Sequence, residues 1–490
     1  MSVVGYSALL RLIVPEVIVV IAALSVLTVD LLFVRETATR VRFTIGAAIS
    51  CIGCAIAVAW MLAAPQHADI FDGTLVIRPQ TQLIQIALLI LTVFVIWLSI
   101  DSTFTTHVGE YLALILFATT GMMFLVASQN ILLIFISLEL LSLALYILAA
   151  FDKRSGQSAE AALKYFLFGG ASAAFTLFGL SLVYGLSGST NLTQIAAATR
   201  GHSFDPLLAV AIVMTVVGFG FKVAAVPFHF WAPDVYEGSP TSSAALIASS
   251  AKVAGIVVFY QVIVIGFAGA QGSSAWGTYV PGWVPVIALL AASSIVLGNL
   301  VAIMQTSVRR LLAYSAIAHV GYMLLALVSH TEQSFQALLY YALTYALTTI
   351  GTFGVVSVVE TKIGGDKLSD FSGLSRRAPV LSFCMLIFLL SLAGIPPLAG
   401  FFGKFYLFTS TLAAEPKTSG LLWLVILAIA MSAVSLYYYL QVLKRIYIAD
   451  PPTDAAPIQT PIVIQVAICL IAFSVVLLGC APNILLEWLQ

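Results

Sequence analysis

The feature that most constrains this chain is a succession of apolar runs, each about 20 residues long and almost without charge. A helix that rises 1.5 Å per residue needs about 20 residues to cross the roughly 30 Å hydrocarbon core of a bilayer. Of the 490 residues, 61% are hydrophobic and only 9% are charged, whereas soluble domains carry roughly a quarter charged residues. The sequence therefore predicts an all-α polytopic membrane protein.

Hydropathy windows of about 19 residues indicate fourteen transmembrane spans. We expect them at 12–33, 43–64, 83–100, 111–127, 131–151, 161–186, 207–231, 242–268, 283–304, 311–329, 334–359, 380–412, 421–443 and 462–478. The first run contains Glu16 and is followed by no small-residue cleavage site, so we interpret it as a transmembrane helix and not as a signal peptide. The connecting stretches are short, which excludes a separate soluble domain.

The positive charges are distributed unequally between the two ends of the spans. One side carries thirteen cations: Arg35, Arg40, Arg42, Lys153, Arg154, Arg309, Arg310, Lys362, Lys367, Arg376, Arg377, Lys444 and Arg445. The other side carries four: Arg11, Arg78, Arg200 and Lys417. The positive-inside rule places the first side in the cytoplasm and both termini outside. These seventeen leave four of the 21 cations, and all four fall within spans: Lys164, Lys222, Lys252 and Lys404.

Several ionisable residues lie near the middle of the predicted spans, where a charge costs about 2.5–3.5 kcal/mol. They are Glu139, Lys222, Lys252, His319 and Lys404. Such residues either form structural ion pairs between helices or mark an ion path. One structural pair would not need three buried lysines, so the set favours an ion path. Lysine suits proton transfer, because burial favours its neutral form while a nearby carboxylate favours its charged form.

Other polar residues in the spans allow simpler interpretations. For His229, at the end of the seventh span, an interfacial role and a proton relay are both open. Glu16 and Asp30 lie nearer the ends of the first span, where we expect their side chains to reach the interface. The tyrosines at 437–439 are expected to pack or to sit at the membrane interface. Cys51 and Cys54 form a CxxC inside an apolar run, where packing is expected in place of metal or redox chemistry.

Two spans contain helix-breaking residues next to a lysine. The seventh reads GFGFKVAAVPFHFW around Lys222, and the twelfth reads LAGIPPLAGFFGKF before Lys404. Proline removes a backbone hydrogen bond, and in lipid the freed carbonyls are tolerated only inside protein or beside a wet cavity. The breaks are five spans apart, an odd offset, so a repeat would be inverted, as in ion-coupled transporters. We expect three N-terminal helices (1–110), two inverted five-helix repeats (111–268 and 283–448) and a C-terminal helix (460–490).

Several motifs in this order resemble a known family. The stretch KVAAVPFHFWAPDVYEGSPT from Lys222 to Thr241 is similar to the antiporter-like subunits of respiratory complex I and of multisubunit cation/proton antiporters. The PDVYEGSPT form, SLELLSLALY around Glu139, FSGLSRRAP and SLAGIPPLAGFFGKF resemble the subunit N family of bacterial proton-pumping NADH:quinone oxidoreductase. The resemblance extends over nearly the whole chain.

The resemblance implies a role for each intramembrane residue. Glu139 would be the partner of the broken-helix Lys222, Lys252 a bridging lysine and Lys404 the lysine that leads outward, while His229 and His319 match family positions of less certain role. The chain itself would bind no cofactor; NADH, FMN, iron–sulfur clusters and quinone would be bound by other subunits. Its partners would be membrane lipid and other membrane-arm subunits, including a second antiporter-like subunit and a small neighbour similar to subunit K, with no nucleic acid.

Three functions therefore compete. The first is a proton-translocating, non-redox subunit of NADH:quinone oxidoreductase in the bacterial inner membrane, with both termini periplasmic. The second is a subunit of a multisubunit cation/proton antiporter that works without redox coupling. The third is a structural membrane scaffold, which the buried lysines disfavour.

Overall fold

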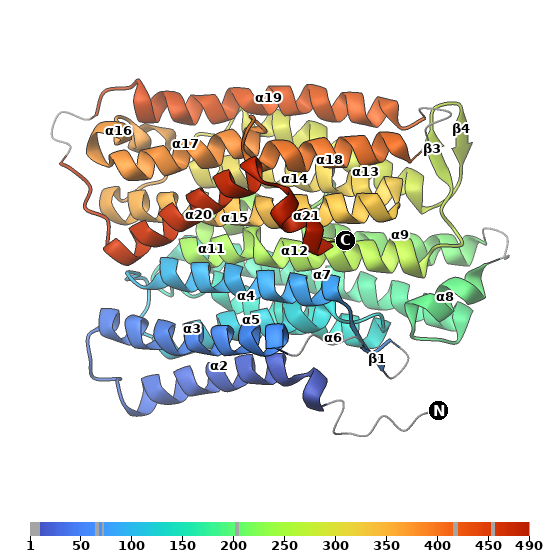
Figure 1. The fold of residues 1–490 in the computed structure, drawn as a ribbon, viewed down its shortest axis with the longest axis horizontal. Helices are drawn as coiled ribbons and strands as arrows, with labels where there is room; N and C mark the ends of the chain where they lie inside the picture. Colours follow the sequence, from blue (N-terminus) through green and yellow to red (C-terminus); the bar gives the residue numbers. More distant parts are fainter. Residues whose placement is uncertain are drawn as a thin grey trace.

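The computed structural model describes residues 10–63, 68–70, 73–200, 205–414, 420–451 and 456–489, and these residues fold almost entirely into helices that lie side by side (Figure 1). The uninterrupted long helices are α2 (Val14–Leu32), α3 (Thr39–Ala63), α4 (Pro79–Ser99), α5 (Val108–Val126), α6 (Ile131–Ala149), α7 (Gly156–Ser187), α13 (Trp283–Ala302), α14 (Val308–Ser329), α15 (Glu332–Ile363), α19 (Leu422–Tyr447) and α20 (Ile462–Cys480). The remaining spans are interrupted.

Three spans are built from shorter helices. The seventh consists of α9 (Pro206–Val223) and α10 (Trp231–Gly238), and the twelfth of α17 (Pro379–Ala393) and α18 (Ala399–Ala413). The eighth consists of α11 (Thr241–Ala248), α12 (Ser250–Tyr260) and a π-helical turn, η1 (Gln261–Gly266). Thirteen helical stretches of the described residues are long and apolar enough to cross a membrane, and the broken twelfth span completes the predicted fourteen. The predicted polytopic all-α fold with discontinuous helices is confirmed.

Short elements connect the spans. They are α8 (Leu192–Thr199), the 3₁₀ turn η2 (Leu368–Phe371), α16 (Leu374–Arg377), α21 (Asn483–Leu489) and two antiparallel hairpins, β1 (Ala68–Ile70) with β2 (Leu75–Ile77) and β3 (Ser273–Ala275) with β4 (Thr278–Val280). The start of α2 and the end of α21 lie on the same side of the bundle (Figure 1). Lys417, one of the predicted outside cations, lies outside the described residues.

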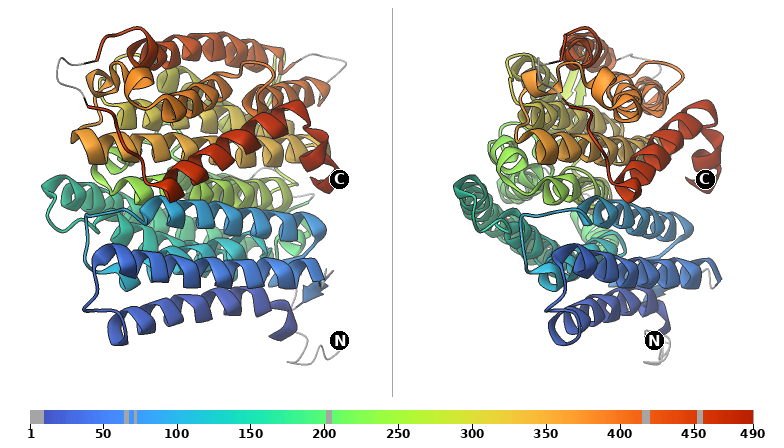
Figure 2. Two further views of the ribbon diagram at one scale, coloured as in Figure 1. Left: turned by 60° about the vertical axis from the view of Figure 1, so that its left-hand side comes forward. Right: turned by 90° about the vertical axis from the view of Figure 1, so that its left-hand side faces the viewer.

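The centre of the bundle is formed by α11, α12, α14 and α15, in which almost every side chain is buried. Helices α7 and α19 lie at the periphery of the bundle (Figure 2). They expose large apolar side chains along their length, as helices facing lipid do. The predicted intramembrane residues Lys252 and His319 lie on central helices, α12 and α14. Side chains at these positions can reach one another only through the interior of the protein.

The helix ends follow ordinary capping chemistry. Asn130, Ser155 and Ser307 accept hydrogen bonds from backbone N–H groups at the starts of α6, α7 and α14, which satisfies donors without intrahelical partners. Gly188 and Gly364 end α7 and α15 in the left-handed conformation, at φ 68° and 85°, where a glycine carries no Cβ penalty. Local sequence thus specifies where the long helices begin and end.

The two predicted breaks have related forms. Helix α9 is followed by Ala224, which has φ 62°, and α17 is followed by Gly394, which has φ 86°. Each break then contains a cis peptide bond, Val226–Pro227 in the first and Pro396–Pro397 in the second. The lysines differ in place, since Lys222 lies in the last turn of α9 and Lys404 lies in α18, beyond the break.

The third break, at Ser249, was missed by the sequence analysis, which treated 242–268 as one continuous span. Ser249 separates α11 from α12 with φ −116° and ψ −89°, and its hydroxyl donates to the Ala245 carbonyl at 2.5 Å. Such a bond can bend a helix, but the same bond occurs in unbroken helices here, for example from Ser50 to Gly46, so it does not by itself account for the break. The break lies three residues before Lys252, so all three intramembrane lysines near mid-span adjoin an interrupted helix.

Candidate proton path

The first site joins α6 to the end of α9. The Lys222 ammonium donates to the Ser142 hydroxyl at 2.9 Å, and Ser142 lies three residues after Glu139 on α6. Glu139 and Lys222 influence each other electrostatically but form no direct ion pair within the described residues. Both side chains are half-buried. The predicted partners are therefore close enough to sense each other's charge, with a serine hydroxyl at the lysine.

Glu139 lies beside an outward-facing strip of α6. The strip consists of exposed apolar side chains: Leu132, Ile136, Leu140 and Leu143. In a membrane this strip faces lipid or a neighbouring subunit. A charge next to Glu139 on such a neighbour would act on the carboxylate across little protein, since the side chain is only half-buried.

Lys252 occupies the centre of the bundle. Its side chain is 2% exposed, and its ammonium has no hydrogen-bond partner among the described residues. The ammonium instead lies 5.4 Å from the centre of the Tyr236 ring, within the range of a cation–π interaction. Tyr236 belongs to α10, the short second half of the broken seventh span. A buried ammonium without hydrogen bonds can give up its proton at smaller cost than a fully solvated one.

His319 connects the centre of the bundle to several tyrosines. Its Nδ1 lies 2.5 Å from the hydroxyl of Tyr341 and its Nε2 lies 3.2 Å from the hydroxyl of Tyr439. The imidazole is 3% exposed, and it interacts electrostatically with both Lys252 and Lys404. A histidine whose two ring nitrogens both have hydroxyl partners can accept a proton on one side and release one on the other.

Asn299 extends this group of tyrosines towards Lys404. The hydroxyl of Tyr438 donates to Asn299 Oδ1 at 3.0 Å, and Asn299 Nδ2 donates to the hydroxyl of Tyr322 at 3.0 Å. The Tyr322 ring in turn lies 5.1 Å from the Lys404 ammonium. Tyr438 and Tyr439 stand next to each other, with ring centres 4.5 Å apart. Buried polar side chains therefore form an almost continuous row from His319 to Lys404.

Lys404 reaches back to the end of the preceding half-helix. Its ammonium donates to the carbonyls of Leu392 and Ala393 at 3.0 and 3.1 Å and to the Ser432 hydroxyl at 2.8 Å. The two carbonyls lie in the last turn of α17, where helical carbonyls have no intrahelical donor. Lys404 also lines a hollow of about 310 Å³ between α18 and α19. The ammonium thus bonds the end of α17 and also borders the hollow between α18 and α19, which lies outside the tyrosine row.

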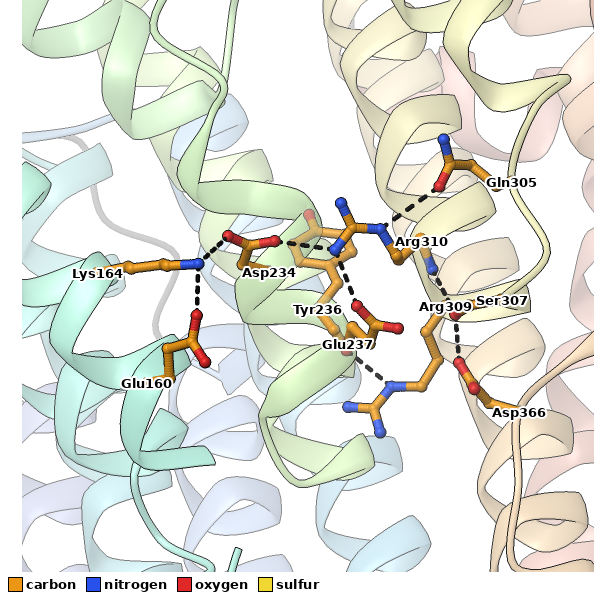
Figure 3. Close-up of polar contacts among 10 residues, drawn as sticks. All are labelled: Glu160, Lys164, Asp234, Tyr236, Glu237, Gln305, Ser307, Arg309, Arg310 and Asp366. Atoms are coloured by element: carbon orange, nitrogen blue, oxygen red, sulfur yellow. Dashed lines mark hydrogen bonds and ion pairs between the residues drawn. The ribbon is translucent and has the colours of Figure 1, made fainter. Parts of the chain in front are cut away.

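A network of charges closes one end of the broken seventh span (Figure 3). Lys164 contacts Glu160 at 2.7 Å and Asp234 at 2.6 Å, and Arg310 contacts Asp234 at 2.9 Å and Glu237 at 2.8 Å. Asp234 therefore accepts hydrogen bonds from two cations on two different helices, Lys164 of α7 and Arg310 of α14. Glu160 and Lys164 lie four residues apart on one face of α7, and the network extends from them to α10 and α14.

His229 remains the least determined of the predicted site residues. It lies in the break between α9 and α10, is 4% exposed, and stacks on Phe230 with ring centres 4.5 Å apart. Its Nδ1 has no hydrogen-bond partner among the described residues. A buried, unsatisfied ring nitrogen argues against a fully satisfied interfacial histidine.

Some sequence-based interpretations of polar residues were wrong. Glu16 and Asp30 do not reach the interface: both are 3% exposed, Glu16 accepts from Gln85 at 2.8 Å, and Asp30 forms two hydrogen bonds with Arg42 at 2.8 and 2.5 Å. Charges near helix ends are buried here because α2 packs against α3 and α5.

The tyrosines at 437–439 fit the expectation that they pack or sit at the interface, but two of them also belong to the site. Tyr437 is 54% exposed, as an interface residue would be, but Tyr438 and Tyr439 are buried and hydrogen-bonded. Asn299, Tyr236 and Tyr341 were not selected from the sequence at all. Asn299 and Tyr341 occupy apolar helices with no charge beside them, and Tyr236 stands next to the charged Glu237 in α10, so no local pattern marks any of the three as a site residue. Within the described residues, no group of three or more His, Cys, Asp or Glu side chains could hold a metal ion.

Comparison with known proteins defines the class of protein. The family model described as NADH:quinone oxidoreductase/Mrp antiporter, TM, matches residues 128–432, a stretch that contains all six predicted site residues and the whole of α14. The chain belongs to this family of antiporter-like membrane subunits.

Individual members of the family differ in how similar they are to this chain. The chain is 53% identical, over the full length of both chains, to NADH-quinone oxidoreductase subunit N 2 of Acidobacterium capsulatum. Its structure is similar to a chain of respiratory complex I from Thermus thermophilus, with 33% identity, a TM-score of 0.79, and coverage of 96% of this chain and 98% of that chain. A chain of the Mrp complex from Dietzia sp. shares the fold, at 18% identity and a TM-score of 0.80, covering 97% of this chain and 95% of that chain.

Proposed function

We propose that this chain is a membrane-arm subunit of a proton-pumping NADH:quinone oxidoreductase, and that it translocates protons through its buried lysines. The observation that carries the proposal is the row of intramembrane groups from Lys252 through His319 to Lys404, each buried and each next to tyrosine. A structural ion pair needs one cation and one anion, whereas this row contains two lysines and a histidine with no buried carboxylate among them. Relatives identical at 53% and 33% are named for the same complex.

The mechanism follows from electrostatics between these groups. A charge change in a neighbouring subunit beside Glu139 alters the balance between Glu139 and Lys222 across the Ser142 hydroxyl. When the Glu139 carboxylate no longer stabilises the charged form of Lys222, Lys222 releases its proton inward to Lys252. Lys252 passes the proton to His319 and the tyrosine row, and Lys404 receives it at the second break. Lys222 takes up a new proton when the Glu139 carboxylate is again free to stabilise the ammonium form of Lys222.

The finer features of the proposal rest on the same residues. The chain works as a non-redox translocase, with NADH, FMN, iron–sulfur clusters and quinone held by other subunits. Its neighbours in the membrane are a second antiporter-like subunit and a small subunit similar to subunit K. Residues 111–268 and 283–448 act as two inverted repeats, each with a broken helix, flanked by an N-terminal unit (1–110) and a C-terminal helix (460–490). Both termini face the periplasm of a bacterial inner membrane, as the 13-to-4 distribution of cations predicts.

A cation/proton antiporter subunit is the second candidate, because the Mrp chain has the same fold. That likeness, at 18% identity, supports the fold alone, whereas the likeness to the complex I chain is 33% identical over nearly the full length. Neither candidate places a redox centre in this chain. The distinction therefore lies in the partners that assemble with it.

The two candidates are separated by isolating the chain from its native membrane with its partners attached. An affinity tag on this chain should recover an assembly with bound flavin and iron–sulfur centres that reduces quinone with NADH. Inverted vesicles from the same cells should acidify on addition of NADH and should stop when this gene is deleted. Recovery of an assembly without flavin or iron–sulfur centres, together with sodium-dependent proton exchange, would support the antiporter and reject the proposed function.

A further inference from the structure

The half-helix α10 is held in place by hydrogen bonds from a side chain of another helix. It has eight residues, lies between the first break and Pro240, and is too short to be stable alone. Its last carbonyls have no intrahelical donors, and inside a membrane such groups need protein partners. Arg309, in the first turn of α14, supplies them: its Nε donates to the Tyr236 carbonyl at 2.7 Å and its Nη2 donates to the Ser239 carbonyl. Figure 3 shows the Arg309 side chain extending to this end of α10.

Tyr236, whose backbone carbonyl accepts a hydrogen bond from Arg309, is also the residue whose ring faces Lys252. Tyr236 is completely buried, and the centre of its ring lies 5.4 Å from the Lys252 ammonium. The Tyr236 hydroxyl, like the ammonium, has no hydrogen-bond partner among the described residues. The position of the ring therefore depends on the backbone of α10, and that backbone is fixed at Tyr236 by Arg309.

The same arginine belongs to the helix that carries His319. Arg309 and His319 are ten residues apart on α14, so one rigid helix sets both the ring beneath Lys252 and the imidazole beyond it. Glu360 of α15 completes the arrangement: it accepts from Arg309 Nη1 at 2.9 Å and from the Thr241 hydroxyl at the start of α11. Arg309 is 4% exposed, whereas the side chain of Glu360 is 35% exposed.

We propose that Arg309 is a positioning residue for proton transfer at Lys252, acting through the backbone carbonyl of Tyr236. This inference rests on the proposed function. The planar guanidinium is required because its separate N–H groups bond the Tyr236 and Ser239 carbonyls and Glu360 at once. A lysine would keep the charge next to Glu360 but could not reproduce this fork. The carbonyl bonds, and not the charge pair with Glu360, fix the ring.

The test compares matched variants in the assembled complex, reconstituted into vesicles. Arg309→Lys should lower proton pumping several-fold while NADH oxidation with an artificial acceptor stays normal, and Glu360→Gln should leave pumping near the wild-type rate. Arg376→Lys is the control, since the Arg376 side chain is 62% exposed and, within the described part of the chain, its ion pair is with Asp450, which is itself 84% exposed. Normal pumping in Arg309→Lys, or an equal loss in Glu360→Gln, would overturn the inference.

A double substitution separates positioning from a general effect on folding. If Arg309 acts through Tyr236, then Arg309→Lys should cause little further loss of pumping in a Tyr236→Leu background, because contacting residues show non-additive effects. Additive losses would mean that Arg309 affects pumping by another route, which also overturns the inference. Lys252→Ala is measured in parallel. If it pumps normally, the proposed proton path itself fails; if it does not pump and Arg309→Lys does, only the inference about Arg309 fails.

Discussion

Lys404 and Lys222 should respond differently to removal, although both are intramembrane lysines. Lys404→Ala removes three hydrogen bonds, to two carbonyls of α17 and to Ser432, whereas Lys222→Ala removes one, to Ser142. Each variant loses one bond to a serine hydroxyl, and each removes one intramembrane ammonium, whose insertion costs about 2.5–3.5 kcal/mol. What remains is the pair of carbonyls at the end of α17.

The size of the difference follows from these two bonds. A hydrogen bond to a charged group contributes about 1.5–3 kcal/mol, so two contribute about 3–6 kcal/mol. Water entering the hollow of about 310 Å³ beside Lys404 replaces part of this loss. We therefore expect Lys404→Ala to destabilise the subunit by about 3 kcal/mol more than Lys222→Ala does, the lower end of that range.

The assay heats detergent-solubilised complex in steps and measures how much of this subunit stays with the complex on a native gel. Lys404→Ala should lose the subunit at a lower temperature than wild type, and Lys222→Ala should resemble wild type. Lys404→Arg keeps donors at the α17 carbonyls and should restore much of the stability. Equal loss in Lys222→Ala and Lys404→Ala would refute the structural role that we assign to Lys404.

Three further predictions test the topology, the packing and the chemistry. Single cysteines at Arg376 and Asp205 should differ towards an impermeant thiol reagent added to intact cells, with only the position at Asp205 reacting; labelling at Arg376 would reverse the orientation. Gly218→Ala should impair assembly, because a Cβ there would lie 1.8 Å from Thr176 Oγ1 and 3.1 Å from its Cα, whereas Gly185→Ala meets nothing within 4 Å and should be silent; equal behaviour would contradict the packing of α7 on α9. The purified chain should show no absorbance from flavin, haem or iron–sulfur centres, and a stoichiometric chromophore would reject the non-redox role.

The sequence predicted the spans and two of the three breaks because their causes are local. Apolar length defines a transmembrane helix, and Gly and Pro next to Lys222 and Lys404 mark a break. The break at Ser249 has no such marker, since neither Gly nor Pro stands beside it in the sequence. Likewise, Lys222 and Lys404 could be chosen as site residues since a charge in an apolar run is conspicuous in any sequence.

The partners of those residues could not be predicted in the same way. His319 meets Tyr341 and Tyr439, which are 22 and 120 residues away in the chain, and tyrosine is common enough in membrane helices that its presence alone indicates nothing. Asp30 was expected at the interface because position along a helix suggested it, but Arg42 on the next helix and the Gly109 N–H bind it inside the bundle. Tertiary contacts between distant segments, and not local pattern, determine these sites.

The central claim is that Lys222 and Glu139 form a switch that turnover requires and assembly does not. In Lys222→Ala, Glu139 loses its cation and takes up a proton, so no uncompensated charge remains and the complex should assemble. We predict normal reduction of an artificial acceptor, with NADH–quinone activity and proton pumping both sharply lower, and no full rescue in Lys222→Arg, because a guanidinium does not release its proton. Near-normal proton pumping by assembled complex carrying Lys222→Ala, and by complex carrying Glu139→Gln, would show that the two residues are structural only.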